Sequence, residues 1–292
     1  MAAMLAIISA FLYSLAMIMA QIGLKDTDTF SGALISMVFS FIGSLFLFIY
    51  YVPISHFANW GLIYFIISGL SGPCLGRFLL FIGINRVGSS IASTLYSIKP
   101  LFSAIAAVLI LSENLTKGIG AATIIMVVGL AIVSFEESGK KIESSWSKKD
   151  LLFPVMAGAA YGLSQVFRKI GLNIYHDPMM GVVVQNVTAL SFSLALALLR
   201  KSHQQVSVNH RKAWVFFGLQ GIFSISGQLT SFYALNTGSV IIVSPLSSIS
   251  PLFVIVIAGI FLRKVERITG KIILGAILII GGTFILFFFP GR

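Results

Sequence analysis

The sequence predicts an all-α membrane protein with ten transmembrane helices, arranged as two inverted repeats of five helices each. Two observations lead to this prediction: the chain is too apolar for water, and one pattern of residues occurs in it twice. Of its 292 residues, 57% are hydrophobic and only 10% are charged, whereas soluble domains contain about 25% charged residues. A chain with so few charges cannot cover a surface that faces water, and its mean hydropathy of +0.99 agrees with this.

The duplication joins segments that lie roughly half the chain apart. The matching segments are Pro-Leu-Phe at 100–102 and 251–253, Ile-Gly-Leu at 22–24 and 170–172, and Tyr13 with Tyr161. The offset is 151 residues for the first match and 148 for the other two. In a membrane protein, such internal duplication is typical of transporters.

We therefore expect two domains of the same kind. The first is residues 1–135, the second is residues 151–292, and the charged linker 136–150 joins them.

The expected transmembrane spans follow from runs of about 20 apolar residues, the length that crosses a bilayer. Acidic residues or prolines separate several of these runs, for example Asp26 and Asp28 after the first run and Pro53 after the second. The expected spans are residues 3–24, 30–50, 60–84, 88–111, 118–135, 151–173, 178–199, 213–235, 239–262 and 271–289.

The orientation of the chain follows from the charges of its loops. Because each repeat has an odd number of spans, the two copies are expected to lie upside down relative to each other, with a binding site near the bilayer midplane between them. Loops after odd-numbered spans carry fourteen Lys and Arg residues, and loops after even-numbered spans carry two, counting the C-terminus. Since Lys and Arg concentrate in cytoplasmic loops, we expect both termini outside the cytoplasm, in a multi-pass protein of the cell (inner) membrane.

One motif occurs near the end of the fourth span and again near the end of the ninth. It is Pro100 followed by Glu113-x-x-Thr116, and Pro251 followed by Glu266-x-x-Thr269. Together with ten spans in a five-plus-five repeat, this motif resembles the drug/metabolite transporter superfamily, and within it the EamA family. The resemblance covers essentially the whole chain and implies a carrier of small metabolites, without fixing the substrate. It also implies cytoplasmic termini, which is the opposite of what the loop charges predict.

Four cations are expected inside the spans: Arg77, Lys99, Arg168 and Lys169. All acidic residues and all histidines fall outside the spans. A charge at bilayer depth costs at least about 2.5–3.5 kcal/mol and usually faces a cavity or a partner. Since no carboxylate is expected nearby, the natural counter-charge is an anionic ligand.

Two of these cations lie next to prolines. Arg77 follows Pro73 in a glycine-rich stretch, and its guanidinium suits a carboxylate or a phosphate. Lys99 lies near the centre of the fourth span, directly before Pro100, and Tyr96 shares its helix face. We expect both cations to bind substrate. The alternative is structural: each would bind backbone carbonyls that the neighbouring proline leaves free.

The sixth and eighth spans contribute further candidates for substrate binding. Tyr161, Gln165 and Arg168 share one helical stripe, which must face something other than lipid. Lys169 points about 100° away from Arg168, and its alternative role is to extend to the membrane surface. Gln228 aligns with Arg77 across the repeat, although buried amides such as Gln185, Asn186 and Gln220 often only join helices.

Four prolines are expected to kink or gate the helices: Pro73, Pro100, Pro245 and Pro251. Pro245 and Pro251 lie six residues apart in the ninth span. This spacing is consistent with a flexible gate, and the alternative is a static kink.

These features predict a secondary transporter for a small anionic or zwitterionic solute, working by alternating access. The alternative is a flippase for an anionic lipid head group such as a polyprenyl phosphate. An enzyme or receptor is disfavoured, because no catalytic constellation, metal-ligand cluster or nucleotide-binding loop is present. We expect no cofactor and no nucleic-acid partner, and a monomer or weak homodimer in the bilayer.

Overall fold

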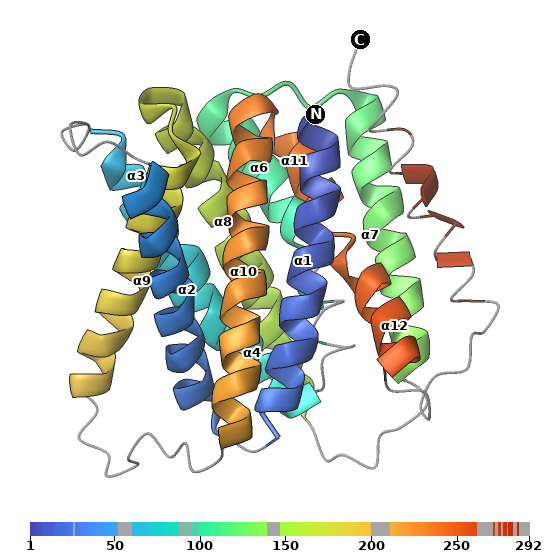
Figure 1. Ribbon diagram of the computed structural model, residues 1–292. Helices are drawn as coiled ribbons and strands as arrows, with labels where there is room; N and C mark the ends of the chain where they lie inside the picture. The colour runs from blue at the N-terminus through green and yellow to red at the C-terminus, as the bar shows by residue number, and fades with distance from the viewer. Residues whose placement is uncertain are drawn as a thin grey trace.

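The computed structural model describes residues 1–25, 27–51, 60–87, 92, 95–96, 98–138, 147–199, 211–261, 271, 274–275, 277–278, 280–282 and 285. Within this part the chain is a bundle of helices without a strand (Figure 1), which confirms the predicted all-α class. The elements are α1 (Ala2–Gly23), α2 (Thr29–Tyr51), α3 (Leu62–Gly69), the π-helix η2 (Leu70–Gly76), α4 (Arg77–Val87), α6 (Lys99–Leu111), α7 (Lys117–Ser138), the short 3₁₀ helix η3 (Lys148–Leu151), α8 (Leu152–Tyr175), α9 (Pro178–Leu199), α10 (Arg211–Thr237), α11 (Val240–Ser247) and α12 (Ser250–Phe261).

Several of these helices are long and apolar enough to cross a membrane. By length and composition the four candidates are Ala2–Gly23, Thr29–Tyr50, Leu62–Val87 and Pro178–Leu198. The chain is therefore a multi-pass membrane protein. The tenth expected span, 271–289, falls largely outside the described residues, and those of its residues that are described are helical.

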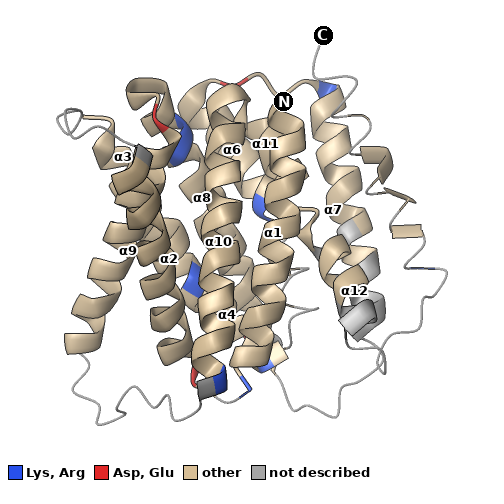
Figure 2. Ribbon diagram, viewed as in Figure 1, with Lys and Arg blue, Asp and Glu red and all other residues tan. Residues whose placement is uncertain are grey.

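Acidic and basic residues are distributed differently along the bundle. Figure 2 shows the acidic residues of the described part at the two ends of the bundle, whereas basic residues also occur between the ends.

Contacts between helices give their relative directions. α1 packs along α10 in the opposite direction, since Ser9 donates to the carbonyl of Gly227 at 2.7 Å while Gly23 lies against Phe217. α9 runs opposite to α2: Ser193 bonds to Met37, while Phe48 near the end of α2 packs on Met180 near the start of α9.

The segment α3–η2–α4 packs along α8, again in the opposite direction. Ser68 of α3 and Ser164 of α8 are hydrogen-bonded at 2.9 Å near the middle. At the end of α4, Arg86 forms an ion pair with Asp150 of η3, the short helix directly before α8. Each of these helices is thus held in place by a partner from the other half of the chain.

The fourth and ninth spans are both interrupted, at equivalent positions. Before α6, Ile98 donates to Leu95 at 3.3 Å, and Leu101 donates back to Ile98 at 3.0 Å. Between α11 and α12, Ile249 donates to Leu246 at 3.5 Å, and Leu252 donates to Ile249 at 3.0 Å. All three positions are 151 residues apart. These bonds span three residues instead of four, so both helices restart directly before Pro100 and Pro251.

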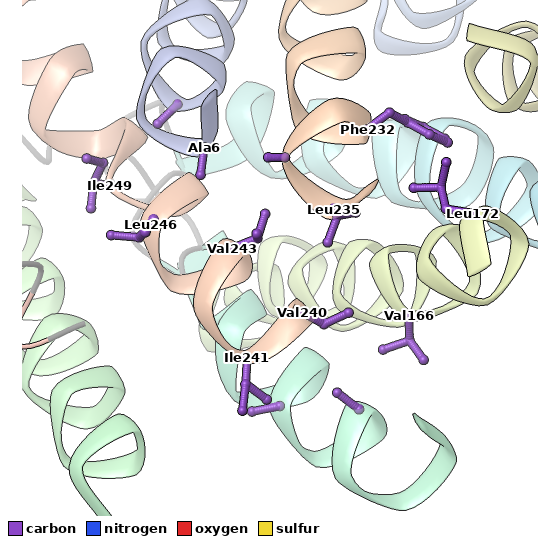
Figure 3. Packing of buried hydrophobic residues seen from close by; sticks show 14 of the residues in the cluster. Ala6, Val166, Leu172, Phe232, Leu235, Val240, Ile241, Val243, Leu246 and Ile249 are labelled. Atoms are coloured by element: carbon purple, nitrogen blue, oxygen red, sulfur yellow. The ribbon is translucent and has the colours of Figure 1, made fainter. Parts of the chain in front are cut away.

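Two hydrophobic clusters fill the two ends of the bundle. One gathers side chains of α8, α10 and α11, including Leu172, Phe232, Leu235, Val240 and Leu246, which are essentially without exposed surface (Figure 3). The other surrounds the last turns of α1 and α4 and the first turns of α10, with residues such as Ile18, Phe81, Ile84 and Phe217. Polar side chains collect between the two clusters.

Glycines let phenylalanine rings sit directly against helix backbones. A Cβ at Gly32 would lie 2.5 Å from the Cζ of Phe217, and one at Gly23 would lie 2.9 Å from the same ring. In the second half, a Cβ at Gly171 would lie 2.5 Å from the Cε1 of Phe65. Because lipid gives no hydrophobic drive between helices, this close packing is what holds them together.

Candidate functional site

A polar cavity lies between helices of both halves. It has about 550 Å³ of empty space, part of it open to the surroundings. Its polar lining consists of Tyr13, Arg77, Tyr96, Lys99, Tyr161, Gln220, Ser224, Ser247 and Ser250, and its apolar lining of Ala16, Met17, Ala20, Leu80, Phe81 and Ile84. Four of the predicted site residues are brought together here: Arg77, Tyr96, Lys99 and Tyr161.

Arg77 is held by serine hydroxyls. Its Nη1 donates to Ser36 at 2.9 Å and to Ser40 at 3.3 Å, both on α2, and its Nη2 donates to Ser224 on α10 at 3.0 Å. The side chain is only 4% exposed. Serine hydroxyls orient the guanidinium but carry no charge, so these bonds leave its positive charge uncompensated.

Lys99 is the second cation of the cavity. Its Nζ donates to the Ser247 hydroxyl at 3.3 Å and lies 5.5 Å from the centre of the Tyr96 ring. Gln165 donates to the same hydroxyl at 3.3 Å. Lys99 is 3% exposed, and these partners too are uncharged.

We expected Lys99 near the centre of the fourth span, directly before Pro100. In the structure the helix α6 begins at Lys99 itself. The reason is Pro100, which takes the first turn of the helix, where its missing N–H costs nothing.

Tyrosine rings line the cavity from both repeats. Tyr96 and Tyr161 meet edge to face, with ring centres 5.4 Å apart. Tyr161 lies against Gly76, where a Cβ would come within 2.6 Å of its ring. Tyr13, the repeat counterpart of Tyr161, also lines the cavity. Sequence reasoning noted that match without assigning Tyr13 to the site, although the repeat was the signal that could have done so.

Arg168 is not among the residues that line the cavity, but its side chain is hydrogen-bonded to Tyr13, which is. It is 2% exposed, and its Cζ lies 5.0 Å above the ring of Phe232. Among the described residues, its Nε and Nη2 have no hydrogen-bond partner. Lys169 is further from the cavity: its Nζ donates to the carbonyl of Leu235, near the end of α10, at 2.8 Å.

Gln228 belongs to a network of amides that joins helices. It donates to Gln185 at 2.6 Å and accepts from Asn186 at 2.8 Å. Gln185 in turn donates to Ser68 at 2.6 Å and to Ser164 at 3.2 Å. This network connects α3, α8, α9 and α10, and Gln228 does not line the cavity described above.

The prolines break the helices in different ways. Pro73 lies inside the π-helix η2, one turn before Arg77, and Pro245 lies inside α11. Pro100 is the second residue of α6, and Pro251 occupies the matching place in α12, its side chain outside the described set. Whether any of them acts as a gate stays a prediction.

Glu113 has a role that sequence reasoning missed. Its two carboxylate oxygens accept from the backbone N–H groups of Val240 at 2.9 Å and Ile241 at 3.0 Å. These are the first residues of α11, whose N-cap, Ser239, makes no side-chain capping bond. A carboxylate there satisfies free donors and complements the helix dipole. The Glu-x-x-Thr motif drew attention to Glu113, but the sequence did not show that its carboxylate binds the start of α11.

Two comparisons with known proteins describe what the chain resembles. A protein of Methanocaldococcus jannaschii named "Uncharacterized protein MJ1333.1" is 26% identical over 136 residues, which are 94% of that protein and 47% of this chain. A solved crystal structure shares the fold, with a TM-score of 0.75 at 14% sequence identity, over 97% of this chain and 95% of the other.

The fold is that of a helical membrane protein, and it encloses a cavity lined by buried cations, tyrosines and serines. The sequence model of the EamA-like transporter family matches residues 1–135 and again residues 148–288. The chain therefore belongs to the EamA-like transporter family, as its motif predicted, and is consistent with membership of the drug/metabolite transporter superfamily. The family makes it a membrane transporter of a small molecule.

Proposed function

We propose that the protein is a secondary transporter of a small anionic or zwitterionic organic solute that carries a carboxylate or a phosphate. The observation that supports this is a pair of buried cations, Arg77 and Lys99, at one cavity, with serine hydroxyls as their hydrogen-bond partners. In a low-dielectric surrounding, such cations attract an anion strongly. The planar guanidinium can also bind a carboxylate or phosphate through two parallel hydrogen bonds.

The mechanism we propose is alternating access by two inverted repeats. Counterpart helices run in opposite directions where their contacts relate them, as α2 and α9 do. The breaks at Ile98 and Ile249 have matching hydrogen bonds. Two repeats of equal fold and opposite direction can exchange conformations, which opens the central cavity first at one end and then at the other.

In the conformation described here, the cavity extends toward one end. From Tyr13 and Arg77 its lining continues along Ala20 of α1 and Ile84 of α4, toward the last turns of these helices. In the sequence, the ends of α1 and α4 lead into loops that follow odd-numbered spans, and the loops of this kind carry fourteen of the Lys and Arg residues. We propose that this end is cytoplasmic, in the cell membrane. A reporter that is active only in the cytoplasm, fused after Arg292, should then be silent, and an active reporter would reverse the orientation.

The anion site can be tested by thermal unfolding of the purified protein. A panel of amino acids, organic phosphates and dicarboxylates should contain compounds that raise the melting temperature, because a ligand that binds only the folded state stabilises it by mass action. The variant Arg77→Gln/Lys99→Gln keeps polar side chains and removes both charges. It should lose the stabilisation and lose transport in proteoliposomes.

The matched control is Lys25→Gln/Lys117→Gln, which removes the same net charge at exposed positions and should behave like the wild type. Wild-type affinity in a folded Arg77→Gln/Lys99→Gln protein would contradict the proposal. Stabilisation by a polyprenyl phosphate, with every soluble anion ineffective, would instead favour a lipid flippase.

A further inference from the structure

Five buried side chains in the described part have polar atoms without a hydrogen-bond partner, and four of the five lie in the second repeat, Thr27 being the exception. Of the six buried side-chain atoms without a hydrogen-bond partner in the described part, four belong to Gln165, Arg168 and Ser231. Another belongs to Gln220, which lines the cavity. Buried polar atoms are nearly always paired, and an unpaired donor costs about 1–3 kcal/mol. Gln165, Arg168 and Ser231 therefore need an explanation.

The repeat gives each of them a counterpart in the first half. With the offset of 148 residues between α1 and α8, Gln165 corresponds to Met17 and Arg168 to Ala20. With the offset of 151 residues between α4 and α10, Ser231 corresponds to Leu80. The counterparts Met17, Ala20 and Leu80 all line the cavity. The unpaired polar atoms thus occupy, in the second repeat, the positions that form the cavity wall in the first.

The contacts of the two repeats support this correspondence. A Cβ at Gly76 would meet the ring of Tyr161 at 2.6 Å, and a Cβ at Gly227, its counterpart, would meet the ring of Tyr13 at 3.3 Å. These two tyrosines are themselves counterparts.

Aromatic pairs at the two ends match as well. Phe81 and Phe217 have ring centres 6.2 Å apart, and at the opposite end Phe232 and Phe65 are 5.9 Å apart. Both rings are buried, but Phe81 lines the cavity, whereas its counterpart Phe232 does not and lies against Arg168. The half around Arg168 is therefore the closed counterpart of the open half.

We propose that Gln165, Arg168 and Ser231 form a second anion-contacting site, which lines the cavity when the molecule opens at its other end. This rests on the proposed alternating access. If the two repeats exchange conformations, the second-repeat residues take the place that Met17, Ala20 and Leu80 have now. Phe232 then leaves the guanidinium, and the Nε and Nη2 of Arg168 face the cavity.

The second site has a chemistry of its own. The first-repeat positions are apolar, whereas the second-repeat positions supply a guanidinium, an amide and a hydroxyl. A carboxylate or phosphate that reaches this half would accept from the two free donors of Arg168, as a planar fork allows. Gln165 Oε1 and Ser231 Oγ could pair with neighbouring donors of a zwitterion or with water.

The test uses thiol accessibility and needs no knowledge of the natural substrate. In a Cys74→Ser background, Ser231→Cys reports on the proposed site, and Leu80→Cys reports on the present cavity as the matched position. Because the hydroxyl of Ser231 has no hydrogen-bond partner in the part of the chain that the structure describes, its replacement removes no bond there. Both variants are reconstituted in sealed vesicles of each orientation and treated with anionic sulfonatoethyl or cationic trimethylammonioethyl methanethiosulfonate. Neither reagent crosses the bilayer, and rates are normalised to those with a free thiol.

We expect the two cysteines to react from opposite sides of the membrane. At Ser231→Cys the anionic reagent should be favoured by roughly tenfold or more, because a charged cleft raises the local concentration of counter-ions by at least this factor. Arg168→Gln should abolish the preference at Ser231→Cys and leave it intact at Leu80→Cys, and Arg168→Lys should retain it.

Three results would overturn the inference in protein that still transports. They are no reaction at Ser231→Cys, reaction from the same side as Leu80→Cys, or an equal preference with and without the Arg168 charge. If the Arg168→Gln variant does not insert into the membrane, the test uses Ser231→Cys with native Arg168. Absence of a preference for the anionic reagent there would also overturn the inference. A failure of the proposed function would be recognised by a different result. The preference of Leu80→Cys for the anionic reagent would then persist in the Arg77→Gln/Lys99→Gln variant.

Discussion

The contact between Glu113 and the start of α11 should contribute strongly to stability. The carboxylate accepts two backbone hydrogen bonds, at 2.9 and 3.0 Å, from residues 127 and 128 positions further along the chain. A hydrogen bond to a charged group contributes about 1.5–3 kcal/mol, and a charge at a helix N-terminus contributes about 0.3–1 kcal/mol more when exposed. Because Glu113 is half-buried, we discount the sum and expect Glu113→Ala to cost about 2–4 kcal/mol.

Two variants separate the parts of this contribution. Glu113→Gln keeps one acceptor oxygen and should cost roughly half as much as Glu113→Ala. Since about 1 kcal/mol shifts the melting temperature of a chain of this size by about 2–4 °C, the alanine variant should melt at least about 4 °C below the wild type. The assay is intrinsic fluorescence during heating of the detergent-purified protein, with the exposed Lys117→Gln at the same end as control. A melting temperature equal to that of the control would refute the role of Glu113 as a cap for α11.

Two further predictions concern packing and pH. Gly69→Ala should destabilise the protein by about 1–3 kcal/mol, as overpacking typically does, because its Cβ would lie 2.6 Å from the backbone carbonyl of Gln185. Gly118→Ala, with nothing within 4 Å, should leave the melting temperature unchanged or raise it. The hydrogen bond from Arg86 holds the pKa of Asp150 below its ordinary value of 3.8, so this contact stabilises the fold above pH 3.8 and is lost as the pH falls below it. Asp150→Asn should therefore lower the melting temperature at neutral pH, and its difference from the wild type should shrink below about pH 4; a pH-independent difference would contradict this.

Much of the fold was predictable because the bilayer restricts the choices. A segment in lipid must satisfy its backbone hydrogen bonds internally, so apolar runs of spanning length become helices. The positions at which the helices are interrupted could be predicted less well. Lys99 lies in an apolar run that reads as continuous, and only the preference of Pro100 for the first helical turn moves the helix start to it.

The site was predictable to the extent that buried charge is rare. The cost of burial singled out Arg77 and Lys99, and the structure places both at one cavity. The serine partners Ser36, Ser40 and Ser224 could not be predicted, because serine is common wherever membrane helices pack closely. Arg168 is buried like Arg77, but it lies behind the lining residue Tyr13 and does not line the cavity itself.

The glycines beneath the phenylalanine rings have a consequence for how this chain tolerates change. Phe217 fills space that exists only because positions 23 and 32 lack a Cβ, and Phe65 does the same beside Gly171. A methyl group added at Gly32 collides with the ring, while a smaller side chain at Phe217 leaves a void. The two substitutions together should cost less than the sum of their separate effects, as for residues in direct contact. Mutational tolerance here is thus epistatic, and each ring and its glycines form one unit of permitted variation.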